Sequence, residues 1–527
     1  MTCLALSILL VDSRPARWTS NRASRVPDAL AGFLAELEDS QLPIFSSQTA
    51  DGTSHESSSM IKSILSIIVI LIASTSNSFA DPVSYFRQHS GVASSKGLPS
   101  DLTAAQPRWI SPLNPGNSTP CIFGDAIYLT TWDEEKKELA TVSIDRSTGD
   151  VNWKQVAPTQ TVEQFHRVGS PASCSVACDG ERVFAFFGSY GMLCYDLAGK
   201  KLWDHPMGPF QDEFGASSSP ILVNGKLILN SDHDLDNFLV GLDAKTGQQL
   251  WKTNRNDFTR SYSTPVVWNV NGQNQVVVAG SLKLVAYDPS NGKPIWWING
   301  LSRIVDTTPV VRGDRLFVAT WTPGGDPSER IGMESFDEAL KAYDKNDDKE
   351  VGKDELPKGS PVTPRFFRID LNQNEKLDQE EWNAHARVFK LAQNVAMAVK
   401  AGGRGDVTET HVEWVQRKSL PTVPSPLVYR DEFYMIKDGG IMTALDVANG
   451  EILKQGRLEG RGNYYASPVA GDGLIYTASE QGVVTIVKAG ANWDVLSSHD
   501  FKQRIMATPV ISRGRFFIRT DAALYCY

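Results

Sequence analysis

Short apolar runs separated by tight polar turns recur along most of this chain. Between Ser217 and Asn254, four such runs are separated by the turn signals Asn224-Gly225 and Asp243 to Gly247. Runs of this length, bounded by turns, predict four short antiparallel strands. A sheet this small cannot bury its own faces, so it requires similar sheets on either side.

The same unit is repeated. Each copy opens with Ser-Pro or Thr-Pro, and most copies end with a turn followed by tryptophan. The proline markers are Pro120, Pro171, Pro220, Pro265, Pro309, Pro426, Pro468 and Pro509, and the tryptophans are Trp153, Trp203, Trp251 and Trp296. Four strands repeated roughly every 40 to 50 residues predict an all-β propeller with antiparallel blades. The eight markers predict eight blades within residues 107–527, and the tryptophans are interpreted as packing anchors between blades.

The last unit predicts how the ring closes. After Pro509 the chain has room for only three strands before its end at Tyr527. The segment around Trp109 precedes the first marker and supplies a tryptophan strand. We therefore expect the N-terminal strand to complete the last blade, which leaves no open sheet edge.

The repeated turn (L/Y)D-x-x-(T/S/N)-G-x-x-x-W, together with the Ser-Pro or Thr-Pro strand, resembles the pyrroloquinoline-quinone-type propeller repeat. That family includes quinoprotein alcohol dehydrogenases and the propeller lipoprotein of the bacterial outer-membrane assembly machinery. The resemblance covers about Trp109 to Tyr527, apart from one insertion. It implies the propeller fold and leaves the function open, because one fold carries many functions.

The N-terminal part has a different pattern. Residues 1–59 look unlike the rest and are interpreted as a non-native or disordered extension. Residues 60–80 combine Lys62, an apolar core of about ten residues and a small-residue exit at Ala80, as a secretory signal peptide does. The core is too short to span a membrane. We expect an exported protein, periplasmic or secreted, that begins near Asp81; a buried apolar strand is the alternative.

Residues 81–106 form a polar lead-in. Its segments Tyr85 to Gly91 and Lys96 to Pro99 resemble the FRG…GLP lead-in of exported bacterial propellers, so we expect it to lie across the propeller surface. Beyond the signal peptide the cysteines are Cys121, Cys174, Cys178, Cys194 and Cys526. Because most of them fall in predicted strands, we expect buried thiols. A disulfide between Cys174 and Cys194 is the alternative.

The long step between Pro309 and Pro426 predicts an insertion over residues 326–392, inside blade five. Two segments in it, 344–355 (loop one) and 370–381 (loop two), resemble EF-hand calcium loops, each after an apolar helix. Oxygen atoms at positions one, three, five, seven and twelve let such a loop surround a hard cation. The expected calcium ligands are Asp344, Asn346, Asp348, Glu350, Glu355, Asp370, Asn372, Asn374, Lys376, Asp378 and Glu381, where Glu350 and Lys376 contribute backbone carbonyls.

Both loops depart from the pattern at position six, which favours glycine because positive φ is needed there. The chain has Lys349 and Glu375 at these positions. A left-handed conformation costs such residues on the order of 1 kcal/mol, which weakens binding without preventing it. In the EF-hand family Val351 and Leu377 are the residues through which paired loops touch. A degenerate pair kept for packing is the alternative.

Residues just before the proline markers are expected to line one mouth of the central funnel. They are rich in cationic and aromatic side chains, which are favoured at binding sites. The candidates are His166, Arg167, Arg260, Tyr262, Arg303, Asp306, Tyr464, Tyr465 and Arg504. They predict a site for an anionic or polar ligand or a peptide loop. The alternative is that these side chains plug the channel and pair with nearby carboxylates.

Three functions remain open. The chain is 41% hydrophobic and 21% charged, with a net charge of −9, so nucleic acid is not an expected partner. The favoured function is an exported, calcium-binding scaffold or binding propeller in the bacterial envelope, with an unidentified protein or small ligand as partner, acting as a monomer. A quinoprotein dehydrogenase is an alternative, although the adjacent cysteines typical of such enzymes are missing, so we expect neither a bound quinone nor catalysis. A calcium-regulated sensor is the other.

Overall fold

The computed structural model describes residues 83–326, 328 and 332–527. The chain consists of two compact units, residues 1–76 and 77–527, and the described residues all belong to the second. The extension 1–59, the expected signal peptide 60–80 and the expected start at Asp81 lie outside the described residues. Among the described residues, none of the helices is both long and apolar enough to span a membrane.

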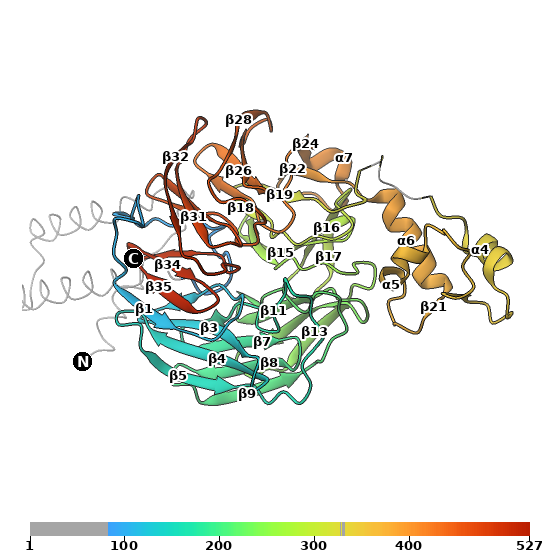
Figure 1. Cartoon of the computed structure of the whole chain (residues 1–527), viewed down its shortest axis with the longest axis horizontal. Helices are drawn as coiled ribbons and strands as arrows, with labels where there is room; N and C mark the ends of the chain where they lie inside the picture. Colours follow the sequence, from blue (N-terminus) through green and yellow to red (C-terminus); the bar gives the residue numbers. More distant parts are fainter. Residues whose placement is uncertain (1–82, 327, 329–331) are drawn as a thin grey trace, which may run out of the picture. The chain divides into compact units, whose positions relative to one another are not determined.

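Eight antiparallel sheets follow one another round a common centre in sequence order (Figure 1). Blades one to three are β2–β5 (Cys121–Phe123, Ala126–Asp133, Glu138–Asp145, Val151–Val156), β6–β9 (Ala177–Cys178, Arg182–Phe187, Gly191–Asp196, Lys201–Pro206) and β10–β13 (Ile221–Val223, Lys226–Ser231, Phe238–Asp243, Gln249–Asn254). Blades four to six are β14–β17 (Val266–Val270, Gln273–Gly280, Lys283–Tyr287, Pro294–Asn299), β18, β19, β22 and β24 (Val310–Arg312, Arg315–Thr320, Val395–Lys400, Val412–Gln416) and β25–β28 (Leu427–Tyr429, Glu432–Lys437, Ile441–Asp446, Ile452–Arg457). Blades seven and eight are β29–β32 (Val469–Gly471, Leu474–Ala478, Val483–Lys488, Asp494–Asp500) and β33–β35 with β1 (Val510–Ser512, Arg515–Arg519, Ala523–Cys526, Trp109–Pro112). The predicted eight-bladed propeller is confirmed.

The N-terminal strand closes the ring as expected. β1 pairs antiparallel with β35, and Trp109 lies opposite Cys526. Blade eight therefore combines strands from both ends of the described chain, which leaves its outer edge covered.

The tryptophans of the repeat join neighbouring blades. The Trp153 indole N–H donates to the Leu197 carbonyl of the next blade at 2.9 Å, and its ring covers the turn at Gly199. Two features favour glycine at position 199: a Cβ there would lie 2.7 Å from that ring, and its φ is positive, at 88°. The same contact recurs at Trp109, Trp203, Trp251 and Trp414. These residues are the packing anchors that the repeat predicts.

Trp296 is an exception. Its indole N–H donates at 2.8 Å to Gln275 within its own blade. The next blade lacks the usual short turn between its last two strands, because residues 401–411 form an excursion there. That excursion contains β23 (Gly405–Asp406), which pairs with β17, and α7 (Thr408–His411).

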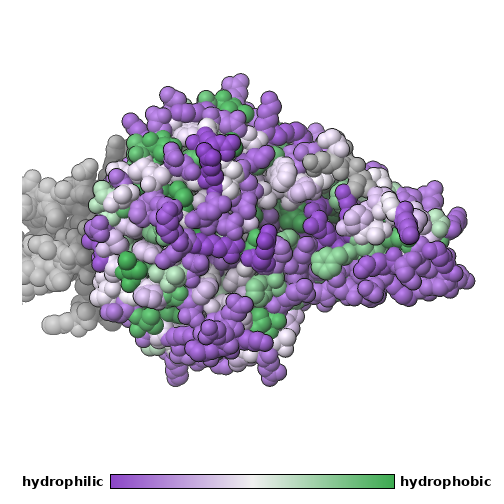
Figure 2. Space-filling view, in the orientation of Figure 1, coloured by the Kyte–Doolittle hydropathy of each residue, from purple (hydrophilic) through white to green (hydrophobic). Residues whose placement is uncertain are grey.

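Blade five contains an insertion between β19 and β22, and the blade is completed after it by β22 and β24. The inserted elements are α4 (Phe336–Tyr343), β20 (Val351–Gly352), η3 (Thr363–Arg365), α5 (Phe366–Ile369), β21 (Lys376–Leu377) and α6 (Gln379–Leu391). They enclose a small core that includes Phe336, Ile369 and Trp382. Mostly hydrophilic side chains cover the outer edge of this insertion (Figure 2).

The lead-in crosses one end of the ring, as expected. Val83 bridges to Ile122 in blade one, Ser90 bonds to Val311 in blade five, and Val92 bridges to Ala470 in blade seven. The buried Arg87 side chain donates to the carbonyls of Pro426 and Pro468 next to the inner strands. This arrangement places Phe86 in the central channel, where it lines the cavity that opens toward the other end.

The five described cysteines are buried and free, so the structure contains the expected thiols, and the alternative Cys174–Cys194 disulfide is not formed. Cys121 and Cys178 lie in one core cluster, and Cys174 and Cys194 lie in another.

Candidate functional site

A ring of hydroxyl side chains surrounds the central channel. Each blade contributes the serine or threonine that lies two residues before the start of its inner strand: Thr119, Ser175, Ser219, Thr264, Thr308, Ser425, Ser467 and Thr508. We call these eight residues the inner tier. Most of their hydroxyls accept a backbone N–H from the preceding blade at 2.9–3.0 Å, for example Ser425 from Thr308 and Ser467 from Ser425. The inner tier therefore links neighbouring blades around the axis.

In blade two, the predicted marker is not the residue pair that occupies the marker position. The Ser170-Pro171 pair is not the equivalent of the other markers, because the inner strand β6 begins only at Ala177. Ser175 takes the equivalent place: it accepts from Thr119 N and donates its own N–H to Ser219, both at 2.9 Å. Val176 thus stands where the other blades have proline.

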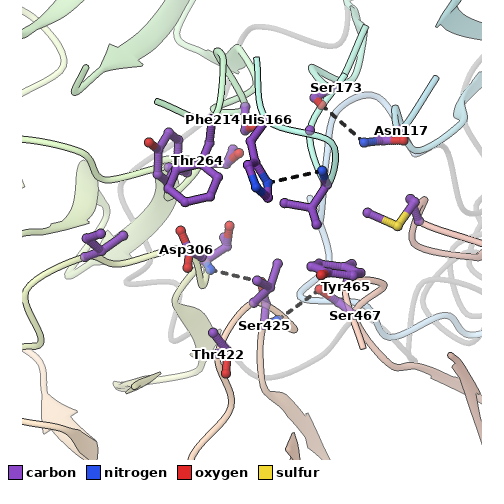
Figure 3. Close-up of a pocket in the computed structure, with 18 of the residues that line it drawn as sticks. Asn117, His166, Ser173, Phe214, Thr264, Asp306, Thr422, Ser425, Tyr465 and Ser467 are labelled. Atoms are coloured by element: carbon purple, nitrogen blue, oxygen red, sulfur yellow. Dashed lines mark hydrogen bonds between the residues drawn. The ribbon is translucent and has the colours of Figure 1, made fainter. Parts of the chain in front are cut away.

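A second ring lies two residues further back along the same extended segments, which lead into the inner strands. Side chains on an extended strand alternate between its faces, so residues two apart point in the same direction. The members of this outer tier are Asn117, Ser173, Ser217, Tyr262, Asp306, Val423, Tyr465 and Met506. Together the two tiers line a cavity of about 540 Å³, and Figure 3 shows Asp306, Ser425 and Tyr465 around it. The outer tier is chemically varied, whereas the inner tier is uniform.

The predicted mouth residues divide into two groups. His166, Arg167, Tyr262, Arg303, Asp306 and Tyr465 line the cavity. Arg260, Tyr464 and Arg504 do not. Tyr464 neighbours Tyr465 and therefore points away from the axis, where its buried hydroxyl donates to Gly460 O at 2.6 Å. Strand alternation thus separates two adjacent tyrosines that sequence reasoning grouped together.

The two arginines outside the cavity are paired with carboxylates. The buried Arg260 forms a bidentate pair with Asp234 and also lies 3.0 Å from Glu213. Arg504 pairs with Glu480 at 2.8 Å. For these two residues, the alternative interpretation of pairing with nearby carboxylates is the one observed.

Arg303 and Asp306 face the cavity without such partners. The buried Nε of Arg303 has no hydrogen-bond acceptor among the described residues. Burial first, and then repulsion by the neighbouring Arg368 and Arg260, lower the pKa of Arg303 to about 10. Burial raises the pKa of Asp306 to about 7, against the opposing effect of Arg303. A guanidinium and a carboxyl group with a pKa of about 7 therefore share one partly desolvated wall.

One loop that shapes the mouth was missed by sequence reasoning. Asp212 accepts the backbone N–H groups of Phe214 and Gly215 and, at 2.8 Å, the hydroxyl of Tyr262. These bonds fix the Phe214 ring near His166, with ring centres 5.3 Å apart, at the edge of the cavity. The loop precedes the blade-three marker, and that position was the only available signal.

A buried carboxyl lies beside this loop. Glu163 is 4% exposed, and neither of its side-chain oxygens has a hydrogen-bond partner among the described residues. Burial raises its pKa to about 8, and repulsion by Asp212 adds to the rise. Glu163 is therefore a proton-binding group in the wall behind the mouth.

The insertion folds both predicted calcium loops in the same way. Position six adopts positive φ in each, 67° at Lys349 and 64° at Glu375, as the loop pattern requires despite the missing glycines. In loop one, the carboxylate of Glu355 accepts the N–H of Lys345 at 2.8 Å, and Glu381 accepts the N–H of Leu371 at 2.8 Å in loop two. Each loop therefore brings its last expected ligand beside its first.

Other expected ligands have partners within the loops. Asp344 and Asp370 accept backbone N–H groups of their own loops, as do Asn346, Asp348, Asn372, Asn374 and Asp378. Lys376 lies 2.6 Å from Asp348 and 3.1 Å from Glu350. Within the described part of the chain, no three or more His, Cys, Asp or Glu side chains are gathered as a metal cluster. Val351 pairs with Leu377 in a short bridge between the loops.

The insertion also contacts the mouth. The Gln211 side chain donates to Leu371 O at the start of loop two. Arg368 of α5 lies 3.8 Å from Glu213, and both residues line the cavity. Arg387 of α6 pairs with Asp257 of blade four at 3.0 Å. One wall of the cavity is therefore shared between the propeller and the insertion.

A family model described as outer membrane protein assembly factor BamB matches residues 101–238 and 235–527, which is more than half of the chain. The chain belongs to this BamB family. No curated protein matches the chain. Family membership agrees with the observed propeller, while the ligand of this BamB-family chain has to be inferred from its own residues.

The solved structures that match this chain include proteins of different kinds. BamB from Moraxella catarrhalis is 12% identical, with a TM-score of 0.49, and the match covers 79% of this chain and 97% of that one. The quinohemoprotein alcohol dehydrogenase ADHIIG from Pseudomonas putida HK5 is 11% identical, with a TM-score of 0.48 and coverages of 80% and 75%. The computationally designed protein Ika8 is 10% identical, with a TM-score of 0.48 and coverages of 80% and 99%.

Proposed function

We propose that this chain is an exported, calcium-binding propeller that acts as a binding or scaffold protein in the bacterial envelope, with the two-tiered cavity as its binding site. The observation that carries the proposal is the outer tier, where varied side chains from all eight blades meet around one cavity. A volume of about 540 Å³ suits a small ligand or a protruding segment of a protein.

Family membership supports a scaffold role, because the matching model is described as an assembly factor. The inner tier supports it as well. Its hydroxyls are used mainly to hold the blades together, so the ring provides a rigid frame on which the outer tier can vary. Rigid frames with varied side chains are typical of binding sites.

Calcium is the proposed cofactor of the insertion, bound in an EF-hand pair. Positive φ at Lys349 and Glu375 and the folding of Glu355 and Glu381 back to the loop starts fit this use. When bound, calcium would take oxygen ligands from both loops and hold the insertion in one conformation. The ammonium of Lys376, paired with Asp348 and Glu350, would have to yield to the ion.

A quinoprotein dehydrogenase and a calcium-regulated sensor remain as alternative functions. None of the described cysteines lines the cavity, so a quinone would not find beside it the cysteine pair typical of those enzymes. The absorbance spectrum of protein purified from its native envelope tests for a bound quinone. A sensor would show new apolar surface when calcium is added.

The proposal is tested by capture of partners from native envelope extracts. Wild-type protein is compared with the double variant Arg303→Gln/Asp306→Asn, and with the control Arg312→Gln/Asp431→Asn, which removes an exposed ion pair of 3.1 Å away from the cavity. We expect the control to retain the captured partners and the mouth variant to lose them. Equal capture by both variants would contradict a binding role for the cavity.

A further inference from the structure

Two unpaired, opposite charges in the cavity wall point to the kind of ligand that the mouth takes. Arg303 and Asp306 lie three residues apart, and neither forms a hydrogen bond or ion pair with any residue that the structure describes. The Arg303 guanidinium lies 5.8 Å from the centre of the Phe389 ring, which supports it from the side of the insertion. Partly buried charges without partners are costly unless a ligand completes them.

Two neighbouring polar side chains, Glu213 and Tyr262, already have partners within the protein. Glu213 lies 3.0 Å from Arg260 and 3.8 Å from Arg368, and the Tyr262 hydroxyl donates to Asp212. Tyr262 therefore offers its ring rather than its hydroxyl to the cavity. A ligand that enters the mouth therefore meets the unpaired Arg303 and Asp306 in the wall, beside aromatic surface and near Arg167.

The inner tier adds hydrogen-bond donors below these charges. Ser425 and Ser467 accept backbone N–H groups, and their own hydroxyl protons have no acceptor among the described residues. A hydroxyl that accepts one bond can still donate another. These protons are suitably placed for the carbonyl oxygens of a peptide backbone.

We propose that the mouth binds a short free peptide as a zwitterion, with its carboxylate on Arg303 and its ammonium on Asp306. The inference rests on the proposed binding function and adds the class of ligand. Side chains of the peptide pack against Tyr262, Tyr465 and Met506 of the outer tier. The cavity is large enough for two or three residues, and Phe86 is one of the residues that line it.

The test uses calorimetry with the tripeptides Ala-Ala-Ala, Ala-Leu-Ala, Ala-Phe-Ala and Ala-Lys-Ala. Each is offered free, N-acetylated and C-amidated to the full exported protein. We expect at least one free tripeptide to bind, and each blocked form to bind about tenfold or more weakly, because each loses one charged hydrogen bond. Absence of heat with every free tripeptide would overturn the inference.

Variants assign each charge to its partner. In Asp306→Asn, the free and N-acetylated peptides should bind equally, while C-amidation still weakens binding. In Arg303→Gln, the free and C-amidated peptides should bind equally, while N-acetylation still weakens binding. The exposed pair Arg312→Gln and Asp431→Asn serves as the control and should bind like wild type. An unchanged tenfold preference for the free ammonium in Asp306→Asn would refute the assignment. If no peptide binds but the mouth variant still loses envelope partners, this inference fails and the proposed function stands.

Discussion

The inner and outer tiers of the channel lie two residues apart on the same segments that lead into the inner strands, yet their side chains differ in chemistry and in partners. The inner tier is uniform, and most of its hydroxyls are bonded to the neighbouring blade. The outer tier combines amide, hydroxyl, aromatic, aliphatic and carboxylate side chains. The comparison teaches that the regular positions of this repeat hold the ring together, whereas the irregular positions determine what it binds.

The largest expected effect comes from comparing two arginines near the mouth, the paired Arg260 and the unpaired Arg303. Arg260→Gln leaves Asp234 as a buried charge without a partner and removes one of the two partners of Glu213, so we expect a loss of about 3–5 kcal/mol in the free energy of unfolding. Denaturant unfolding measures the loss.

Arg303→Gln is the matched control, because Arg303 forms no ion pair with a carboxylate in the described part of the chain. Its free energy of unfolding should stay within about 1 kcal/mol of wild type. If Arg303→Gln lowered the free energy of unfolding as much as Arg260→Gln, both arginines would be structural residues, and the distinction would fail.

The wall behind the mouth should make stability depend on pH. The pKa of Glu163 is raised to about 8 in the folded protein, well above its ordinary value near 4.3, so the folded state binds the proton more tightly. Its contribution to stability is fully present below about pH 4 and is lost as pH rises toward 8 and above.

Glu163→Gln tests this dependence. The wild-type free energy of unfolding should fall between pH 5 and pH 8 by on the order of 2–4 kcal/mol more than that of the variant. Unfolding curves at several pH values measure the slope. Parallel slopes would mean that Glu163 is not protonated in the folded protein.

A smaller effect separates the two tiers directly. Ser467→Ala removes the acceptor for Ser425 N, so we expect a loss of about 1–3 kcal/mol. Tyr465→Phe changes the outer tier and should alter the free energy of unfolding by about 0.5 kcal/mol or less. Similar losses for both variants would break the distinction between a structural and a binding tier.

Removal of calcium should affect the insertion more than the propeller. With a chelator, or in Glu355→Gln and Glu381→Gln, amide hydrogens of α4 and α6 should exchange faster, while those of the blade strands stay protected. Each glutamine variant should also abolish one calcium site in calorimetry, because a bidentate ligand is lost. Wild-type protein that gives no heat with calcium would contradict the EF-hand interpretation.

The repeat predicted the fold well, because blade number, ring closure and tryptophan packing follow from local periodicity. It predicted the site less completely. Which of Tyr464 and Tyr465 faces the cavity depends on the alternation of side chains along the extended chain. The inner-tier serine of blade two, Ser175, is followed by a valine where the other blades have the marker proline, so the marker did not reveal it. Whether an arginine is free depends on partners elsewhere in the chain: Arg260 pairs with Asp234 from another loop, whereas Arg303 forms no ion pair with any described carboxylate. Such pairings become visible only in the folded chain.

The central claim is that ligand contacts are made by the outer tier, and crosslinking tests it most directly. A photoreactive phenylalanine analogue replaces Met506 in the outer tier, or Leu202, which is 47% exposed on the outer strand β9. Both proteins are illuminated in native envelope extract, and the products are identified by mass spectrometry. The account predicts a defined crosslinked product from position 506 and none from position 202. A product from position 202 alone would place binding on the outer faces of the blades and contradict the claim.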